Sequence, residues 1–167
     1  MLGGNKVNPS IIQNKEIYVD GIYINFHKLG YFSRKSALKK AMVLKHKFDF
    51  LTSILGYHCY SIDIPGIFDI TIISYKKDEC PEIQVTLERK NVELTMVIEN
   101  EKISIPLIYY VYNHNQSIRC SVNDNCHYIE DYTKYIFFLL ENKEKLNKRE
   151  IDEFYKKNPA YKIQWLS

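Results

Sequence analysis

The sequence predicts an α+β fold: an antiparallel β-meander of about five strands plus an N-terminal hairpin, with one long helix before the sheet and two helices after it. Three observations support this fold class. Asp20-Gly21 lies between short runs of β-forming residues. Apolar residues recur at helical spacing over residues 33–55 and again after residue 128. Between these two regions, over residues 60–122, the spacing changes to two, which is the period of a half-buried strand.

The hairpin is expected over residues 17–26. Asp-Gly is a favoured two-residue turn because both of its positions adopt positive φ, which these two residues tolerate. Ile22, Ile24 and Phe26 follow at alternate positions and therefore share one face of the second strand.

The long helix is expected over residues 33–55, because one face carries an apolar stripe. Ser33 or Ser36 would cap its start, and Gly56 would adopt the left-handed conformation at its end. The stripe consists of Ala37, Ala41, Leu44, Phe48, Leu51 and Leu55.

The meander is expected to begin with a central strand over residues 67–75, which is apolar on both faces. Apolar and polar residues then alternate over residues 83–88 and 92–99. Further strands are expected over residues 103–112 and 118–122. Pro106 cannot donate a ladder hydrogen bond, so its strand is predicted to be an edge there or to carry a bulge. As an edge, residues 106–112 could accept a strand from a partner.

Two helices are expected to close the chain, over residues 128–142 and 148–157. Together with the earlier elements they predict one hydrophobic core. Its predicted members are Leu44, Phe48, Leu51, Ile72, Val85, Leu94, Ile105, Ile136 and Leu140.

The 167 residues suit one domain, which we place at residues 16–167, after a polar arm at residues 1–15 that is flexible or ordered by a partner. The start of the chain lacks the apolar core of a signal peptide, and no run is long and apolar enough to span a membrane. Four cysteines without a CxxC pair are typical of reduced thiols. We therefore expect an intracellular location, in the cytoplasm or nucleus, and no membrane partner.

No motif for catalysis or cofactor binding is present. The six glycines form neither a GxGxxG nor a GxxxxGK loop, so no nucleotide cofactor is predicted. Cys59, Cys120 and Cys126 have histidines nearby in sequence, but they lack the close cysteine pair typical of tetrahedral zinc sites. We predict no catalytic, cofactor-binding or metal-binding residues, and a small Cys/His or zinc-dependent enzyme is the second alternative.

The start of the long helix is unusually basic. No Asp or Glu lies between residues 34 and 47, although cations are unfavourable near the positive end of a helix dipole. A bound anion, an acidic partner or acidic side chains of the same fold would relieve this conflict. The candidate partner- or anion-binding residues are Lys28, Arg34, Lys35, Lys39, Lys40, Lys45 and Lys47.

These features favour a non-catalytic protein-interaction module, a subunit or accessory protein of a larger assembly whose partner has an acidic surface. The alternative is a nucleic-acid-binding protein that uses the basic start of helix 33–55 to contact phosphates. The net charge of +3 does not decide between them, because the distribution of charge matters more than its sum.

Overall fold

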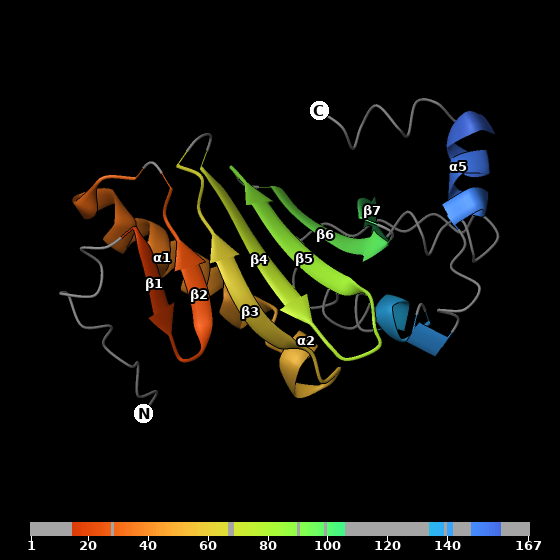
Figure 1. Cartoon of the computed structure of the whole chain (residues 1–167), viewed down its shortest axis with the longest axis horizontal. Coiled ribbons are helices and arrows are strands. Elements are labelled where there is room, and N and C mark those ends of the chain that lie inside the picture. The colour runs from red at the N-terminus through yellow and green to blue at the C-terminus, as the bar shows by residue number, and fades with distance from the viewer. Residues whose placement is uncertain are drawn as a thin grey trace.

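The computed structural model describes residues 15–27, 29–66, 69–89, 91–98, 100–105, 134–138, 140–141 and 148–157. Their architecture is mixed α+β, as predicted, and is built on one seven-stranded sheet (Figure 1). The strands are β1 (Glu16–Val19), β2 (Ile22–Asn25), β3 (His58–Asp63), β4 (Ile70–Lys76), β5 (Glu82–Glu88), β6 (Asn91–Ile98) and β7 (Glu101–Ser104). The helices are α1 (Tyr31–Lys47), α2 (Phe50–Ser53) and α5 (Lys148–Lys157), and residues 134–138 and 140–141 are also helical.

The seven strands lie side by side in sequence order, and β2–β3 is the single parallel pair. Parallel neighbours need a long crossover, which α1 and α2 supply here. The prediction of a helix before the sheet was therefore wrong, because the N-terminal hairpin belongs to the same sheet as the meander. In Figure 1, α1 lies behind the strands and α2 lies next to the start of β3.

The hairpin between β1 and β2 is confirmed. Asp20 and Gly21 both have positive φ, 50° and 79°, and Val19 pairs with Ile22 across the turn. Because both turn positions are left-handed, the loop matches the twist of the two strands.

The predicted helix 33–55 is two helices, and the break at Phe48 and Asp49 has a packing reason. In a continuous helix Phe48 and Phe50 would be 200° apart and could not both face the sheet. The break buries both rings, 5.9 Å apart between centroids, together with Leu51. Gly56, with φ of 73°, follows Leu55 and leads the chain into β3.

The core lies between the sheet and α1–α2. Cross-strand partners Ile24, Ile62, Ile73, Val85 and Leu94 form an apolar row that is completely or almost completely buried. Among the predicted core residues, Leu44, Phe48, Leu51, Val85, Leu94, Ile105 and Ile136 are buried, and Leu140 packs against them half-buried.

Two strand predictions need correction. The sequence did not predict β3 as a strand. Its pairing with β4 shifts register between Cys59 and Ser61, and this irregularity interrupts the alternation of inward and outward side chains. β4 contains Ile72 at a position whose side chain points away from the core, so Ile72 is half-buried, whereas Ile73 is fully buried. An apolar run on both faces does not reveal which residues face the helices.

Several predictions lie outside the described residues. They concern the arm at residues 1–14, the edge strand over residues 106–112 and the strand over residues 118–122. The helix predicted over residues 148–157 coincides with α5. None of the helices in the described ranges has the length and apolarity of a membrane-spanning segment.

Candidate functional site

The first turn of α1 has no side-chain cap. Gly30 occupies the N-cap position, so the predicted capping by Ser33 or Ser36 was wrong, and no acidic residue lies in the first turn. Gly30 accepts a hydrogen bond from the Arg34 backbone N–H. The structure therefore retains the unusual charge pattern that the sequence shows at this helix start.

Arg34 is a structural residue and not part of an exposed basic surface. Arg34 lies one helical turn before buried Leu38, on the inner side of α1, and is 7% exposed. The guanidinium Nε donates a 2.8 Å hydrogen bond to the carbonyl of Leu29, in the segment just before α1. Because so little of Arg34 is exposed, it is not included in the partner-binding surface proposed below.

Two of the candidate lysines are paired within the fold. Lys40 Nζ lies 3.0 Å from Asp69 Oδ1, and Lys45 Nζ lies 3.5 Å from Asp49 Oδ1. Asp69 and Asp49 are thus acidic side chains of the same fold that compensate two of the basic residues, which is one of the alternatives that the sequence left open. Lys28 lies outside the described residues.

The remaining candidates Lys35, Lys39 and Lys47 are exposed on the side of α1 that faces away from the sheet. None of these three lysines forms an ion pair with a carboxylate of the described ranges. Phe32 and Val43 lie on the same side and are 89% and 54% exposed. We call these five residues the outer α1 surface.

The two apolar members of the outer α1 surface were missed by sequence reasoning. Residues 32 and 43 are eleven apart, which is three helical turns and therefore one side of the helix. This spacing was visible in the sequence. The exposure of both residues becomes apparent only once the inner side is known from buried Leu38, Ala41 and Leu44.

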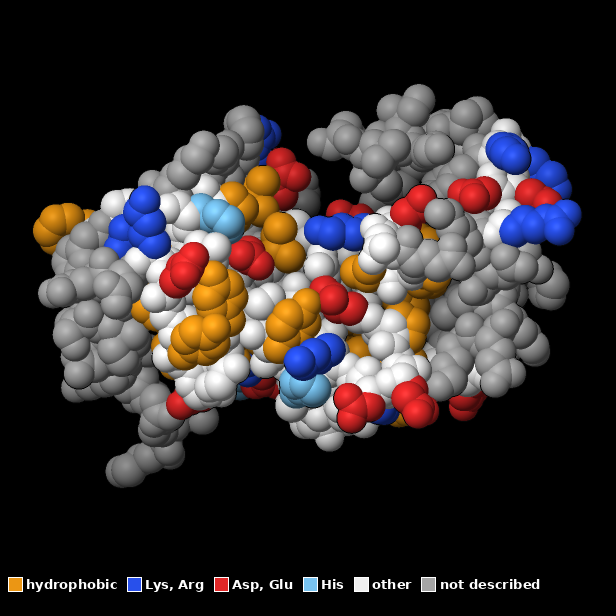
Figure 2. Space-filling view, viewed as in Figure 1, with side chains coloured by type: hydrophobic (Ala, Val, Ile, Leu, Met, Phe, Trp, Pro, Cys, Tyr) orange, Lys and Arg blue, Asp and Glu red, His pale blue; other side chains and the backbone are white. Residues whose placement is uncertain are grey.

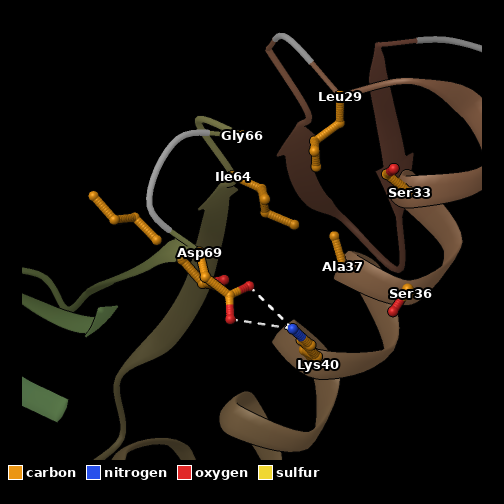
Figure 3. A pocket seen from close by; sticks show the side chains of 10 residues that line it. Leu29, Ser33, Ser36, Ala37, Lys40, Ile64, Gly66 and Asp69 are labelled. Carbon is orange, nitrogen blue, oxygen red and sulfur yellow. Dashed lines mark hydrogen bonds and ion pairs between the residues drawn. The ribbon is translucent and has the colours of Figure 1, made fainter. Parts of the chain in front are cut away.

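A pocket of about 270 Å³ lies between the first half of α1 and the segment joining β3 to β4 (Figure 3). Ser33, Ser36 and Ala37 of α1 face Ile64 and Gly66 across it. The ion pair of Lys40 and Asp69 lies at its wall (Figure 3). Because Asp69 compensates the charge of Lys40, this pocket is poorly suited to binding an anion.

Cys59 does not have the environment of an activated thiol. Cys59 pairs with buried Tyr75 on the core face of the sheet, while the neighbouring His58 is exposed. Burial raises the pKa of the Cys59 thiol to about 11, and nearby Lys45 offsets only part of this effect. An activated thiol requires the opposite shift. Within the described ranges, no three His, Cys, Asp or Glu residues are placed to hold a metal ion.

We therefore expect slow alkylation of Cys59 in the folded protein. At pH 9 a thiol with an ordinary pKa is about half ionised, whereas one with a pKa near 11 is about 1% ionised, a roughly 50-fold difference in thiolate. Iodoacetamide labelling, followed by mass spectrometry of the Cys59 peptide, should be slower by about an order of magnitude than in urea at the same pH, because the higher nucleophilicity of the less acidic thiolate offsets part of the loss. Native labelling as fast as unfolded labelling would contradict the assignment of Cys59 as a structural thiol.

No protein-family model, curated protein or solved structure matches this chain. The candidate site is therefore defined by its own geometry.

Proposed function

We propose that this protein is a non-catalytic interaction module that binds an acidic surface of another protein through the outer α1 surface. The observation that carries the proposal is the combination of exposed Phe32 and Val43 with Lys35, Lys39 and Lys47 on one side of one helix. Exposed apolar side chains supply burial on binding, and the lysines select an acidic partner.

The arrangement favours protein over nucleic acid as the partner. Arg34 is buried, and Lys40 and Lys45 are paired internally, so about half of the predicted cationic side chains are engaged within the fold. Phosphate binding depends on the number of cations presented, whereas exposed Phe32 is better suited to an apolar pocket of a protein.

The test compares the double variant Lys35→Glu/Lys39→Glu with wild-type protein. Its matched control is Lys156→Glu/Lys157→Glu, which reverses two exposed lysines on α5. Wild type, variant and control are each used to capture proteins from the native source. A protein that binds wild type and control, but not the Lys35/Lys39 variant, is then purified. Calorimetry at low and high salt should show binding weakened roughly tenfold or more by the Lys35/Lys39 reversal, because attraction becomes repulsion at two positions.

Equal affinity of the variant and wild type for that purified protein would overturn the proposal. Fluorescence anisotropy with labelled duplex DNA and single-stranded RNA tests the alternative in parallel. Steeply salt-dependent binding of either probe that the Lys35/Lys39 reversal abolishes would instead assign the surface to nucleic acid.

A further inference from the structure

The face of the sheet opposite α1 and α2 is distinct in chemistry from the outer α1 surface. Strand register places Tyr18, Tyr23 and Ser61 in one row on this face, because directly paired residues point to the same side. The neighbouring row contains Glu16, Asn25 and Asp63. Figure 2 views this face and shows hydrophobic side chains, a class that includes tyrosine, beside carboxylates at the surface.

Carboxylates outnumber ammonium groups on this face. Among described strand residues, register directs five carboxylates to it, namely Glu16, Asp63, Glu82, Glu88 and Glu93. It directs two lysines there, Lys76 and Lys102. The face is therefore acidic, the opposite of the outer α1 surface, and complements a basic partner.

The same face already holds one cation over a tyrosine ring. Lys76 Nζ lies 5.1 Å from the centroid of the Tyr60 ring. The Tyr60 hydroxyl lies against Glu82, and desolvation together with this carboxylate raises the pKa of Tyr60. An ammonium group, a tyrosine ring and a glutamate thus form one local arrangement.

A second arrangement of tyrosine and glutamate lies on β1 and β2, at the end of the sheet. The Tyr18 and Tyr23 rings lie 5.3 Å apart between centroids, tilted by 50°, and Tyr18 is 71% exposed. Partial desolvation and the adjacent carboxylate of Glu16 raise the pKa of Tyr23. Among the described residues, no lysine or arginine lies over either ring. Asp63 lies on the same face of the sheet, and its Oδ1 is 3.3 Å from Nε2 of His27.

We propose that Tyr18, Tyr23, Glu16 and Asp63 form a binding site for a lysine or arginine side chain from a basic segment of a partner protein. The cation packs against the tyrosine rings, and the two carboxylates balance its charge. This site does not depend on the outer α1 surface, because its residues come from β1, β2 and β3.

The experiment measures fluorescence anisotropy of a labelled lysine- and serine-containing peptide titrated with the full chain. A matched peptide with glutamate in place of lysine is the charge control. The Tyr18→Leu/Tyr23→Leu variant removes both rings, whereas Tyr18→Phe/Tyr23→Phe keeps them. We expect saturable, salt-sensitive binding of the lysine peptide, about tenfold weaker for the Leu pair and close to wild type for the Phe pair.

Folding of each variant is checked by circular dichroism, and Glu16→Gln provides a second, milder variant that should also weaken binding. Absence of saturable binding, equal binding of the glutamate peptide, or equal affinity of the Leu and Phe pairs would each overturn the proposal. The wild-type chain could instead self-associate in a concentration-dependent way that the Tyr18→Leu/Tyr23→Leu variant abolishes. This result would assign the site to a second copy of this chain and would overturn the proposal of a separate partner. The Lys35→Glu/Lys39→Glu variant should bind the lysine peptide at least as well as wild type, so the two proposed surfaces can fail independently.

Discussion

Replacing Ile73 by alanine should lower the free energy of unfolding by about 3 kcal/mol. Ile73 lies at the centre of β4, is fully buried, and pairs with Ile62 on one side and Val85 on the other. Truncation removes three carbons from a closely packed layer and leaves a cavity beneath the helices. Equilibrium urea unfolding followed by far-UV circular dichroism measures the change, with an unchanged slope expected for an intact fold.

The matched control for Ile73→Ala is Ile72→Ala in the same strand. Both substitutions remove the same β-branched side chain, so they share the same loss of strand propensity. The Ile72 side chain points to the opposite face and is half-buried, so its loss should cost about 1 kcal/mol. Similar destabilisation by the two variants, or a larger effect at Ile72, would contradict the assigned register.

Replacing Arg34 by methionine should destabilise the protein by about 2 kcal/mol. The substitution preserves an unbranched side chain but removes the donor to the Leu29 carbonyl, a 2.8 Å contact inside the protein. This contact fixes the segment between β2 and α1, so its loss should loosen the crossover that allows β2 and β3 to pair in parallel. Thermal and urea unfolding of the variant measure the effect.

Lys35→Met is the control for Arg34→Met, because the two basic residues are adjacent on α1 and differ in burial. Substitution at exposed Lys35 should change the free energy of unfolding by less than about 0.5 kcal/mol. If Arg34→Met were equally mild, Arg34 would not have the structural role assigned to it. Its inclusion among the partner-binding residues would then be reopened.

The candidate site was only partly predictable from the sequence. The basic run was visible, but a sequence does not show which of its members face the core. Helical phase buries Arg34 and leaves Lys35 outside, although the two are neighbours. Asp69, which neutralises Lys40, is 29 residues away in the chain and has no local signal of that role.

The tyrosine and glutamate arrangement was not predicted because it depends on pairing between strands. Tyr18 and Tyr23 come from the two arms of the hairpin, and its turn fixes their register. Asp63 lies near them only because β3 pairs in parallel with β2, and α1 and α2 separate these two strands in the sequence.

Local patterns alone determined the hairpin turn, the alternating strands β5 and β6, and the position of α5. In these elements, turn chemistry and side-chain period act over a few residues, so neighbouring positions carry the whole signal. The tertiary structure alone decided that the hairpin joins the meander, that the long helix breaks at Phe48 and Asp49, and that Ile73 faces the core in place of Ile72. These outcomes depend on burying apolar surface between a sheet and its covering helices, and that free energy arises from contacts between segments far apart in the chain.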